Sequence, residues 1–386
     1  MDDSIMQFLA AETGAKSYKA HKYGLDHAER PSIDYSEDRM IWKEIKETEK
    51  YHTYVPLENL CIELARRGDQ KLTYFLDGSR RVYKVDDHAY PQSGGRNSIY
   101  PIIAGQIGVG CCKRIDKQVH PACFSHEIAI AVPSIANADD RSGFLEAMAL
   151  KLSSLPVLQR MNIKINNVFS YSISKGAEKM EDRGTACIQD RMIECEKDLV
   201  AQLVRKGLLN HNNYLVKDGS LEYRITPELR KDERKRKIFL NNYNWVLGVS
   251  KNFNPEICTD SSGHSNPGFI ADLPLYHRTP VALYEKDMFG DIKYAVWYIR
   301  LHDKSRTRTA LDGILKVEKM LVTEEERTKG IDSELVDMLS ALLINERNPV
   351  CYGSDLRWAN HIYPVYLTET FVKSKYLSAE SFLHLF

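Results

Sequence analysis

The sequence predicts an α/β protein built on a mixed β-sheet, with a helical arm at its N-terminus. Four consecutive strand-like segments with short links indicate an antiparallel meander: 71–78, 80–85, 100–114 and 126–133. Strands and helices then alternate along the rest of the chain, which is typical of βαβ units with helices packed on a sheet. Residues 1–69 are polar with helical stretches. We therefore expect a helical arm at 1–69 and a main domain at 70–386.

Pattern and length assign the elements that follow the meander. The expected helices are 143–158, 185–207, 332–346 and a C-terminal helical end from about residue 365. The expected strands are 165–173, 212–219, 244–253, 313–321 and a hairpin of 280–286 with 293–303. This succession places most of the sheet before residue 321 and closes the domain with helices.

Composition excludes few function classes. The chain has 386 residues, and its 53 basic and 53 acidic residues balance, so any basic surface for a polyanion must be local. No apolar run is long enough to span a membrane, and the N-terminus lacks the pattern of a signal peptide. We expect a cytoplasmic protein whose eight cysteines are reduced thiols.

Asp-Gly-Ser occurs twice, and each time an apolar strand leads directly into it. The first is Asp77-Gly78-Ser79, and the second is Asp218-Gly219-Ser220. Such a tripeptide is commonly an ordinary turn. In an open α/β sheet, however, strand ends are where sites form, so the two carboxylates are candidate site residues.

A third carboxylate lies on the long helix before the second Asp-Gly-Ser. The apolar residues Ile188, Met192, Cys195, Leu199 and Leu203 form one stripe. At 100° per residue, Glu196 falls inside this stripe and Glu194 falls on the opposite side. A carboxylate that faces the core must be paired, protonated or bound to a metal. A salt bridge to a core-edge Arg or Lys is one interpretation, and Glu194 remains a rival if the helix register differs.

Together the three acids favour a metal site. If the two strands are neighbours, Asp77, Glu196 and Asp218 converge without a matching cluster of bases, and such acids need a cation to stay ionised. Oxygen ligands without imidazole or thiolate suit Mg²⁺ or Mn²⁺. Two ions about 3.5 to 4 Å apart would clamp the attacking and leaving oxygens of a phosphodiester.

The order of these motifs resembles the NurA nucleases, whose fold is related to ribonuclease H. The similar features are Asp-Gly-Ser on a first strand, Glu on a helix, "DGSL", "GVSK", "YAVWYIRLHD" with "ILKVEKML", and "HIYPVYL", over about residues 71 to 380. The resemblance implies a ribonuclease H-like sheet flanked by helices. It also implies a manganese-dependent DNA exonuclease and endonuclease, a homodimer, and a hexameric HerA-type ATPase partner in DNA end processing or antiviral defence.

Residue by residue, the resemblance makes Asp77, Glu196 and Asp218 the metal ligands and Lys251 a cation for the scissile phosphate. Members usually carry a His or an acid early in the last helix. Here that position falls near Phe371, so His361 or Glu369 could substitute, or three acids could suffice. The predicted mechanism is in-line attack by a metal-activated hydroxide, with Lys251 offsetting charge on the phosphate.

Two other classes of function remain open from the sequence. The chain could be a non-catalytic assembly subunit of an ATPase complex, whose acids serve as internal salt bridges. A ribonuclease H-like enzyme that cuts RNA or a hybrid would share the same acids. For an ATPase partner, the predicted docking element is the helical arm at 1–69, which begins with the amphipathic segment "SIMQFLAA" at 4–11.

Three further groups of residues have weaker interpretations. Zinc binding near Cys111, Cys112, His120, Cys123 and His126 is disfavoured, because adjacent cysteines on a strand face opposite sides. The stretch with Lys304, Arg306 and Arg308 follows a strand and could contact DNA backbone. The run "RKDERKRK" is interpreted as a solvated helix surface.

Overall fold

The computed structural model describes most of the chain. The described residues are 5–18, 23–24, 40–41, 46–91, 96–173, 179–223, 226–254, 258–259, 266–285, 292–307, 309–348 and 358–386.

Five strands form the centre of the fold. They are β5 (Leu72–Pro91), β6 (Asn97–Ile115), β7 (Gln118–Pro133), β9 (Tyr214–Asp218) and β10 (Val246–Ser250). β5, β6 and β7 form an antiparallel meander, β9 pairs parallel with β5, and β10 pairs parallel with β9. The resulting order, β7-β6-β5-β9-β10, is the order of the ribonuclease H-like fold. The predicted mixed sheet flanked by helices is therefore confirmed.

Further strands extend this sheet to 13 strands in the described part of the chain. Beyond β10 come β15 (Ile314–Met320), β14 (Lys293–Arg300), β13 (Ala282–Glu285), β12 (His277–Arg278) and β4 (Val55–Pro56). At the other side, β8 (Asn167–Tyr171) pairs parallel with β7. β1 (Lys16–Tyr18) and β2 (Tyr23–Gly24) pair with β5, and a separate pair joins β3 (Met40–Ile41) to β11 (Cys258–Thr259).

The first Asp-Gly-Ser is not a turn, although the sequence predicts a strand end there. β5 continues through it, because Asp77, Gly78 and Ser79 all pair with residues of β6. The parallel partner β9 ends at this level instead, and Gly219 turns away with a φ of 82°. Only the second Asp-Gly-Ser therefore ends its own strand.

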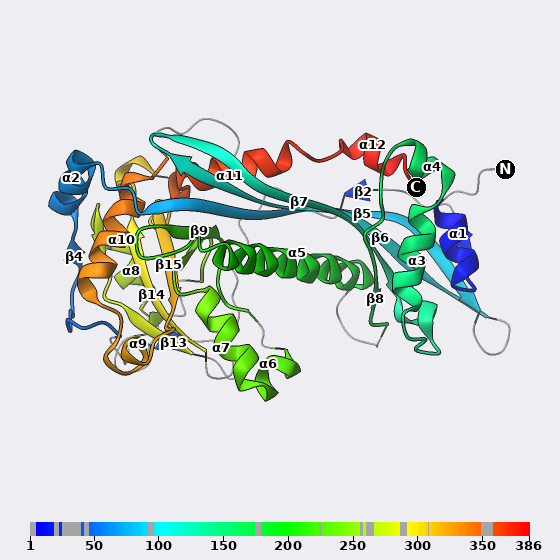
Figure 1. Ribbon diagram of the computed structural model, residues 1–386, viewed down its shortest axis with the longest axis horizontal. Coiled ribbons are helices and arrows are strands. Elements are labelled where there is room, and N and C mark those ends of the chain that lie inside the picture. Colours follow the sequence, from blue (N-terminus) through cyan, green and yellow to red (C-terminus); the bar gives the residue numbers. More distant parts are fainter. Residues whose placement is uncertain are drawn as a thin grey trace.

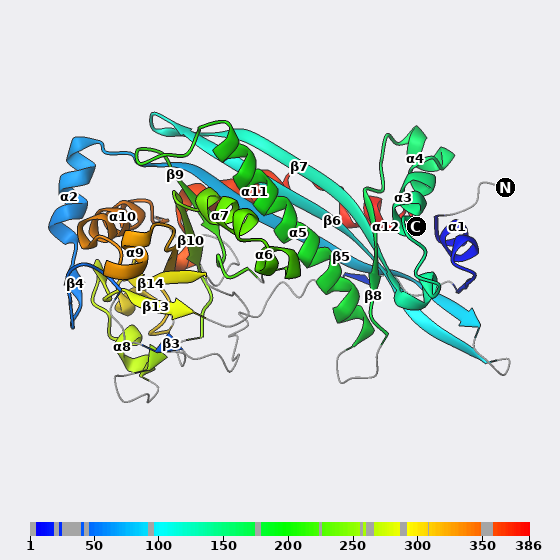
Figure 2. The same cartoon turned by 60° about the horizontal axis from the view of Figure 1, so that its bottom comes forward.

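Helices cover both faces of the sheet, as Figures 1 and 2 show. The long α5 (Met180–Arg205) runs under β5, β6 and β7, while α11 (Tyr363–Lys373) lies on their other face. α2 (Glu58–Arg67) and α10 (Ser333–Asn345) pack at one end of the molecule. The opposite end holds α1 (Ile5–Glu12), α3 (Phe144–Ser153), α4 (Pro156–Arg160) and α12 (Ala379–Leu383). The remaining short helices are α6 (Pro227–Lys231), α7 (Glu233–Asn242), α8 (Pro267–Ala271) and α9 (Glu324–Lys329).

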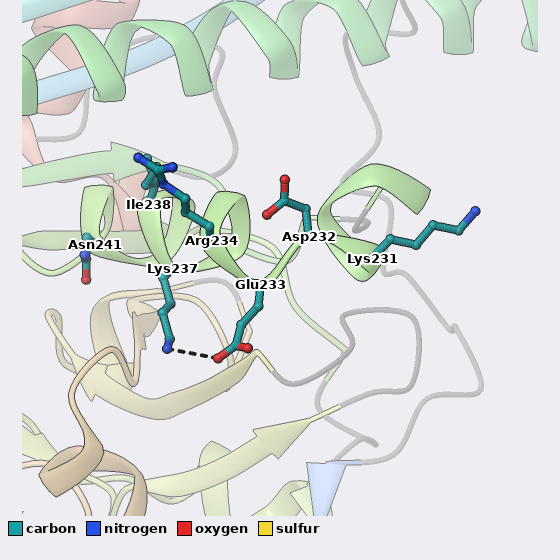
Figure 3. Close-up of a pocket in the computed structure, with 7 residues that line it drawn as sticks. All are labelled: Lys231, Asp232, Glu233, Arg234, Lys237, Ile238 and Asn241. Atoms are coloured by element: carbon teal, nitrogen blue, oxygen red, sulfur yellow. Dashed lines mark ion pairs between the residues drawn. The ribbon is translucent and has the colours of Figure 1, made fainter.

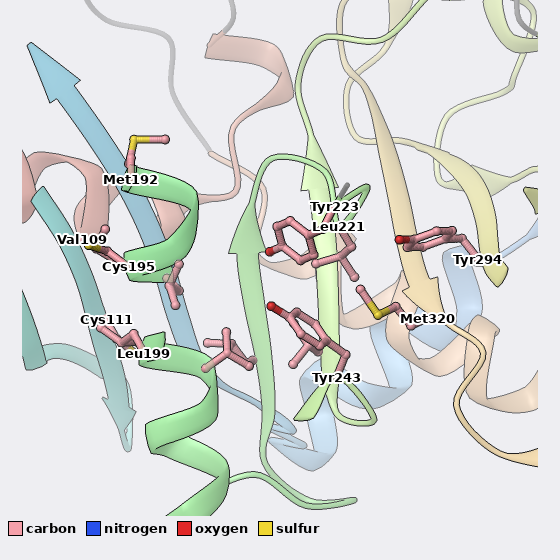
Figure 4. Packing of buried hydrophobic residues seen from close by; sticks show 14 of the residues in the cluster. Val109, Cys111, Met192, Cys195, Leu199, Leu221, Tyr223, Tyr243, Tyr294 and Met320 are labelled. Atoms are coloured by element: carbon pink, nitrogen blue, oxygen red, sulfur yellow. The ribbon is translucent and has the colours of Figure 1, made fainter. Parts of the chain in front are cut away.

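The sheet separates two apolar cores. One core lies between the sheet and α5, where Met192, Cys195 and Leu199 meet tyrosines from the other end of the sheet (Figure 4). The second core lies on the opposite face, against α2, α10 and the start of α11. A third core fills the end formed by α1, α3, α4 and α12. Side chains that alternate along β5 and β9 therefore point into different cores.

The segment 1–69 differs from the predicted helical arm. Its described residues contain two helices and several short strands, and β1, β2 and β4 join the main sheet. The prediction of an unpartnered apolar patch at 4–11 is wrong for its described residues, because Ile5, Met6 and Leu9 are buried in the third core. Burial against the sheet gives these residues a partner within the chain.

Among the described residues, none of the helices combines the length and the apolar character needed to cross a bilayer.

Candidate functional site

Asp77 and Asp218 lie side by side at the level where β9 ends. The parallel pairing of β5 with β9 runs as far as Leu76 opposite Lys217, and the two aspartates follow directly. Asp77 is opposite Gly110 of β6, and a Cβ added to Gly110 would press on Val372 of α11. Since directly paired residues share a face, Asp77 points toward α11. The two strands are therefore neighbours, which is the condition under which the sequence brings Asp77 and Asp218 together.

Lys251 connects the acids on this face. It directly follows β10, and its Nζ lies 2.8 Å from Asp218 Oδ2 and 3.5 Å from Glu369 Oε2. Asn360 fixes the backbone there, because its Nδ2 donates a hydrogen bond of 3.0 Å to the Lys251 carbonyl oxygen. The Lys251 ammonium thus lies between the carboxylates of Asp218 and Glu369, and the carboxylate of Asp77 also acts on it.

The electrostatics of the cluster are uneven. Burial, followed by repulsion from Asp218, raises the pKa of Asp77 well above its ordinary value. Burial also works against ionisation of Asp218, but the attraction of Lys251 outweighs it and lowers the Asp218 pKa. Asp77 is 4% exposed, and its Oδ2 has no hydrogen-bond partner among the described residues. Asp77 is therefore the group on this face whose negative charge is least compensated.

α11 supplies the fourth residue of the cluster, Glu369. Glu369 comes within reach of Lys251, and it also accepts a hydrogen bond of 2.6 Å from Lys373. Burial opposes ionisation of Glu369, yet Lys251 and Lys373 together lower its pKa. Phe371, where the family pattern would place this group, packs instead against Phe124 with ring centroids 5.6 Å apart.

His361 lies beside this cluster as a buried residue. Its ring meets Tyr366 edge-on, with centroids 5.5 Å apart, and its charge contributes to the lowered pKa of Asp218. Of the two substitutes considered for the last helix, Glu369 contacts Lys251 directly, whereas His361 acts on Asp218 at longer range.

Glu196 approaches from the other face of the sheet. It is buried on α5, as the helical stripe predicts, whereas Glu194 is exposed and pairs with Lys197 at 2.8 Å. Glu196 Oε2 lies 3.0 Å from Lys217 Nζ. The Glu196 carboxylate fills the space that a Cβ on Gly78 would occupy. Burial raises the pKa of Glu196, and Lys217 partly offsets this. The salt bridge that the sequence left open is therefore present, and it joins Glu196 to Lys217.

Two residues that sequence reasoning missed shape the turn after Asp218. Lys217 Nζ donates hydrogen bonds to the carbonyl oxygens of Asp218 (2.7 Å) and Ser220 (3.4 Å). Glu318 on β15 accepts from the Ser220 hydroxyl and the Leu221 amide, both at 2.8 Å. Alternation along "YLVKD" could have placed Lys217 on the α5 face, but Glu318 offered no signal without the β10–β15 pairing.

The donor set suits a hard divalent cation. Asp77, Asp218 and Glu369 offer carboxylate oxygens on one face, Asp77 Oδ2 is unsatisfied, and no thiolate takes part. In the described residues, no group of three or more His, Cys, Asp or Glu side chains is arranged to hold a metal as the chain stands. The Lys251 ammonium lies between two of the donors, Asp218 and Glu369, and supplies positive charge there.

The remaining candidates lie apart from this cluster. Cys111 is directly paired with Cys123, while Cys112 turns to the opposite face near Thr368. The free thiols are Cys61, Cys111, Cys112, Cys123, Cys187 and Cys195. Lys304 and Arg306 form an exposed 3-10 turn, where Lys304 lies 3.5 Å from Asp272, and Arg308 lies outside the described residues. Their proposed contact with DNA stays a prediction.

The run "RKDERKRK" forms a helix surface, as predicted. It spans the end of α6 and the start of α7, where an open surface hollow lies among charged side chains (Figure 3). Glu233 and Lys237 pair across one turn at 2.9 Å. The hollow contains none of the acids described above.

Comparison with known proteins gives a likeness to solved structures and none to family models or curated sequences. No protein-family model matches the chain, and no curated protein sequence matches it. The chain is similar to the crystal structure of the NurA nuclease from Sulfolobus solfataricus, with 12% identity and a TM-score of 0.41, over 85% of this chain and 92% of that one. At this level of similarity, the chemistry of the chain has to be inferred from its own residues.

Proposed function

We propose that this chain is a metal-dependent nuclease that hydrolyses phosphodiester bonds of DNA. The observation that carries the proposal is the buried Asp77 Oδ2, which lacks a hydrogen-bond partner in the described part of the chain and faces Asp218 and Glu369. A buried carboxylate oxygen without a partner is costly, and it persists where function needs it. The ribonuclease H-like strand order places it beside a strand end.

Asp77, Asp218 and Glu369 would hold Mn²⁺ or Mg²⁺, with Glu196 completing the set from behind Gly78. A bound metal would supply an activated water and stabilise the leaving oxygen. Lys251 would orient a phosphate, because its ammonium already lies between two of the acids. Lys217 and Glu318 keep the Asp218 turn in place, so the acid does not have to reorganise during the reaction.

The partners follow from the resemblance and from this proposal. We propose a homodimer that works with a hexameric HerA-type ATPase in DNA end processing or antiviral defence. Because the apolar face of α1 packs into the third core, we propose that the ATPase docks on another surface of the chain.

The test is cleavage of labelled single- and double-stranded DNA by the purified chain in Mn²⁺, Mg²⁺ or EDTA. Asp77→Asn and Asp218→Asn should abolish metal-dependent cleavage, while Glu194→Gln, on the exposed side of α5, should cleave like the unmodified chain. An RNA and a hybrid substrate in the same assay separate a deoxyribonuclease from a ribonuclease. Cleavage that survives both aspartate substitutions would contradict the proposal.

A second candidate function is a non-catalytic assembly subunit. It is favoured by one observation, because Glu196 and Asp218 each have a lysine partner and could serve as internal ion pairs. Absence of cleavage under every condition, including with the ATPase added, would select this alternative.

A further inference from the structure

Two exposed tyrosines, Tyr363 and Tyr366, stand at the start of α11, and the second lies about one helical turn before Glu369. Tyr363 and Tyr366 are 43% and 40% exposed, and they are the two aromatic residues among the most exposed large apolar side chains of the described residues. Their rings are nearly parallel, with an angle of 24° and centroids 6.5 Å apart. Exposed aromatic rings of this kind cost free energy in water unless something covers them.

Tyr366 is linked to the acid cluster through His361 and through its place on α11. Tyr366 meets His361 edge-on at 5.5 Å, and His361 acts on Asp218. On the same helix, Glu369 follows Tyr366 by three residues and so lies on nearly the same face. A strand held at Glu369 and the neighbouring acids would therefore lie next to Tyr366.

The chemistry of the pair suits nucleobases. Flat bases stack on Tyr rings whatever their sequence, and this is how sequence-tolerant proteins hold single strands. Stacked bases of a duplex cannot reach such rings without unpairing.

We propose that Tyr363 and Tyr366 form a stacking platform for the unpaired bases of a single strand, next to the phosphate held at the acid cluster. This inference rests on the proposed nuclease function and names its substrate more closely, as a single-stranded or frayed end. The platform positions the strand, and it takes no part in breaking the bond.

The test measures binding without cleavage, in EDTA, with a fluorescent single-stranded DNA oligonucleotide and with a blunt duplex of the same sequence. Tyr363→Ala and Tyr366→Ala should each weaken single-strand binding by about five-fold or more, since an aromatic partner of each base is lost. Tyr→Phe at either position should stay within about two-fold, because the ring remains. Leu150→Ala, at an exposed apolar residue on α3, is the control and should leave affinity unchanged.

A 2-aminopurine base in the oligonucleotide reports stacking directly. Its fluorescence should fall on binding to the unmodified chain and recover in the alanine variants. Unchanged affinity and fluorescence in the variants would overturn the platform, and so would a change only in sedimentation mass, which would show a protein interface. Cleavage by the unmodified chain in Mn²⁺ is scored separately, so the platform can fail while the nuclease stands, or the reverse.

Discussion

The carboxylate of Glu196 occupies the space that a side chain at Gly78 would need. A Cβ built on Gly78 would collide with Glu196 Oε1 and Cδ, and Glu196 is also tied to Lys217 at 3.0 Å. Glycine at this point in a strand costs stability, so its presence is explained by the close approach of the acid. The first Asp-Gly-Ser therefore lies within a continuous strand, and its glycine leaves room for the Glu196 carboxylate.

Gly78→Ala should displace Glu196 and remove cleavage. The methyl group cannot fit unless the buried carboxylate moves away from Lys217, which we expect to cost about 2 kcal/mol of the free energy of unfolding. Chemical denaturation and DNA cleavage measure the two effects. Gly268→Ala, where the nearest atom would be 3.7 Å away, is the control and should keep full cleavage without loss of stability. Full cleavage in Gly78→Ala would show that the position of Glu196 is irrelevant to the reaction.

Glu196→Gln should destabilise the fold by about 3 kcal/mol, because it leaves the buried ammonium of Lys217 without its counter-charge. The same change at Glu194, whose partner Lys197 is near the surface, should stay within about 0.5 kcal/mol. Urea unfolding of both variants gives the comparison. Adding Lys217→Met to Glu196→Gln should recover part of the loss. Equal effects of the two glutamine variants would mean that the charge pair is not buried in solution.

The helical pattern of the sequence is enough to predict that Glu196 faces inward, but it does not predict the salt bridge to Lys217. Steps of 100° along an amphipathic helix placed it inward, and the structure agrees. Its lysine partner lies on a strand of unknown register, so no local rule could pair Glu196 with Lys217. At Asp77 the turn preference of Asp-Gly-Ser was overridden by long-range pairing with β6.

The place of Glu369 depended on packing that the sequence does not show. α11 lies close to β6 because Gly108 and Gly110 leave room for Val372 and Tyr376. That contact sets which residue of the helix faces the acids, and it selects Glu369 rather than the position of Phe371. The order of strands, by contrast, follows from alternation and short links, which are local.

Asp77→Asn should stabilise the protein in EDTA, increasingly so as pH rises. The pKa of Asp77 is raised in the folded state, so its contribution to stability is complete below the ordinary carboxyl pKa and is lost as pH rises through the raised value. Asparagine has no proton to lose and stays neutral, so the melting temperature of this variant should exceed that of the unmodified chain by about 2 °C or more at pH 8. The gap should close near pH 4. A gap independent of pH would contradict the raised pKa.

Lys251→Met should make the fold depend on divalent metal. Without this ammonium, Asp77, Asp218 and Glu369 have lost their shared cation, and we expect a loss of about 3 kcal/mol in EDTA. Mn²⁺ should restore more stability to this variant than it adds to the unmodified chain, because a cation at the acids then replaces the missing charge.

Melting temperatures across a Mn²⁺ titration measure this difference. Lys329→Met, which breaks the exposed pair with Glu325, is the control and should lose at most about 0.5 kcal/mol with no added response to Mn²⁺. If Mn²⁺ stabilises Lys251→Met no more than it stabilises the control, the acids around Lys251 do not bind the metal, and the proposed nuclease site loses its chemical basis.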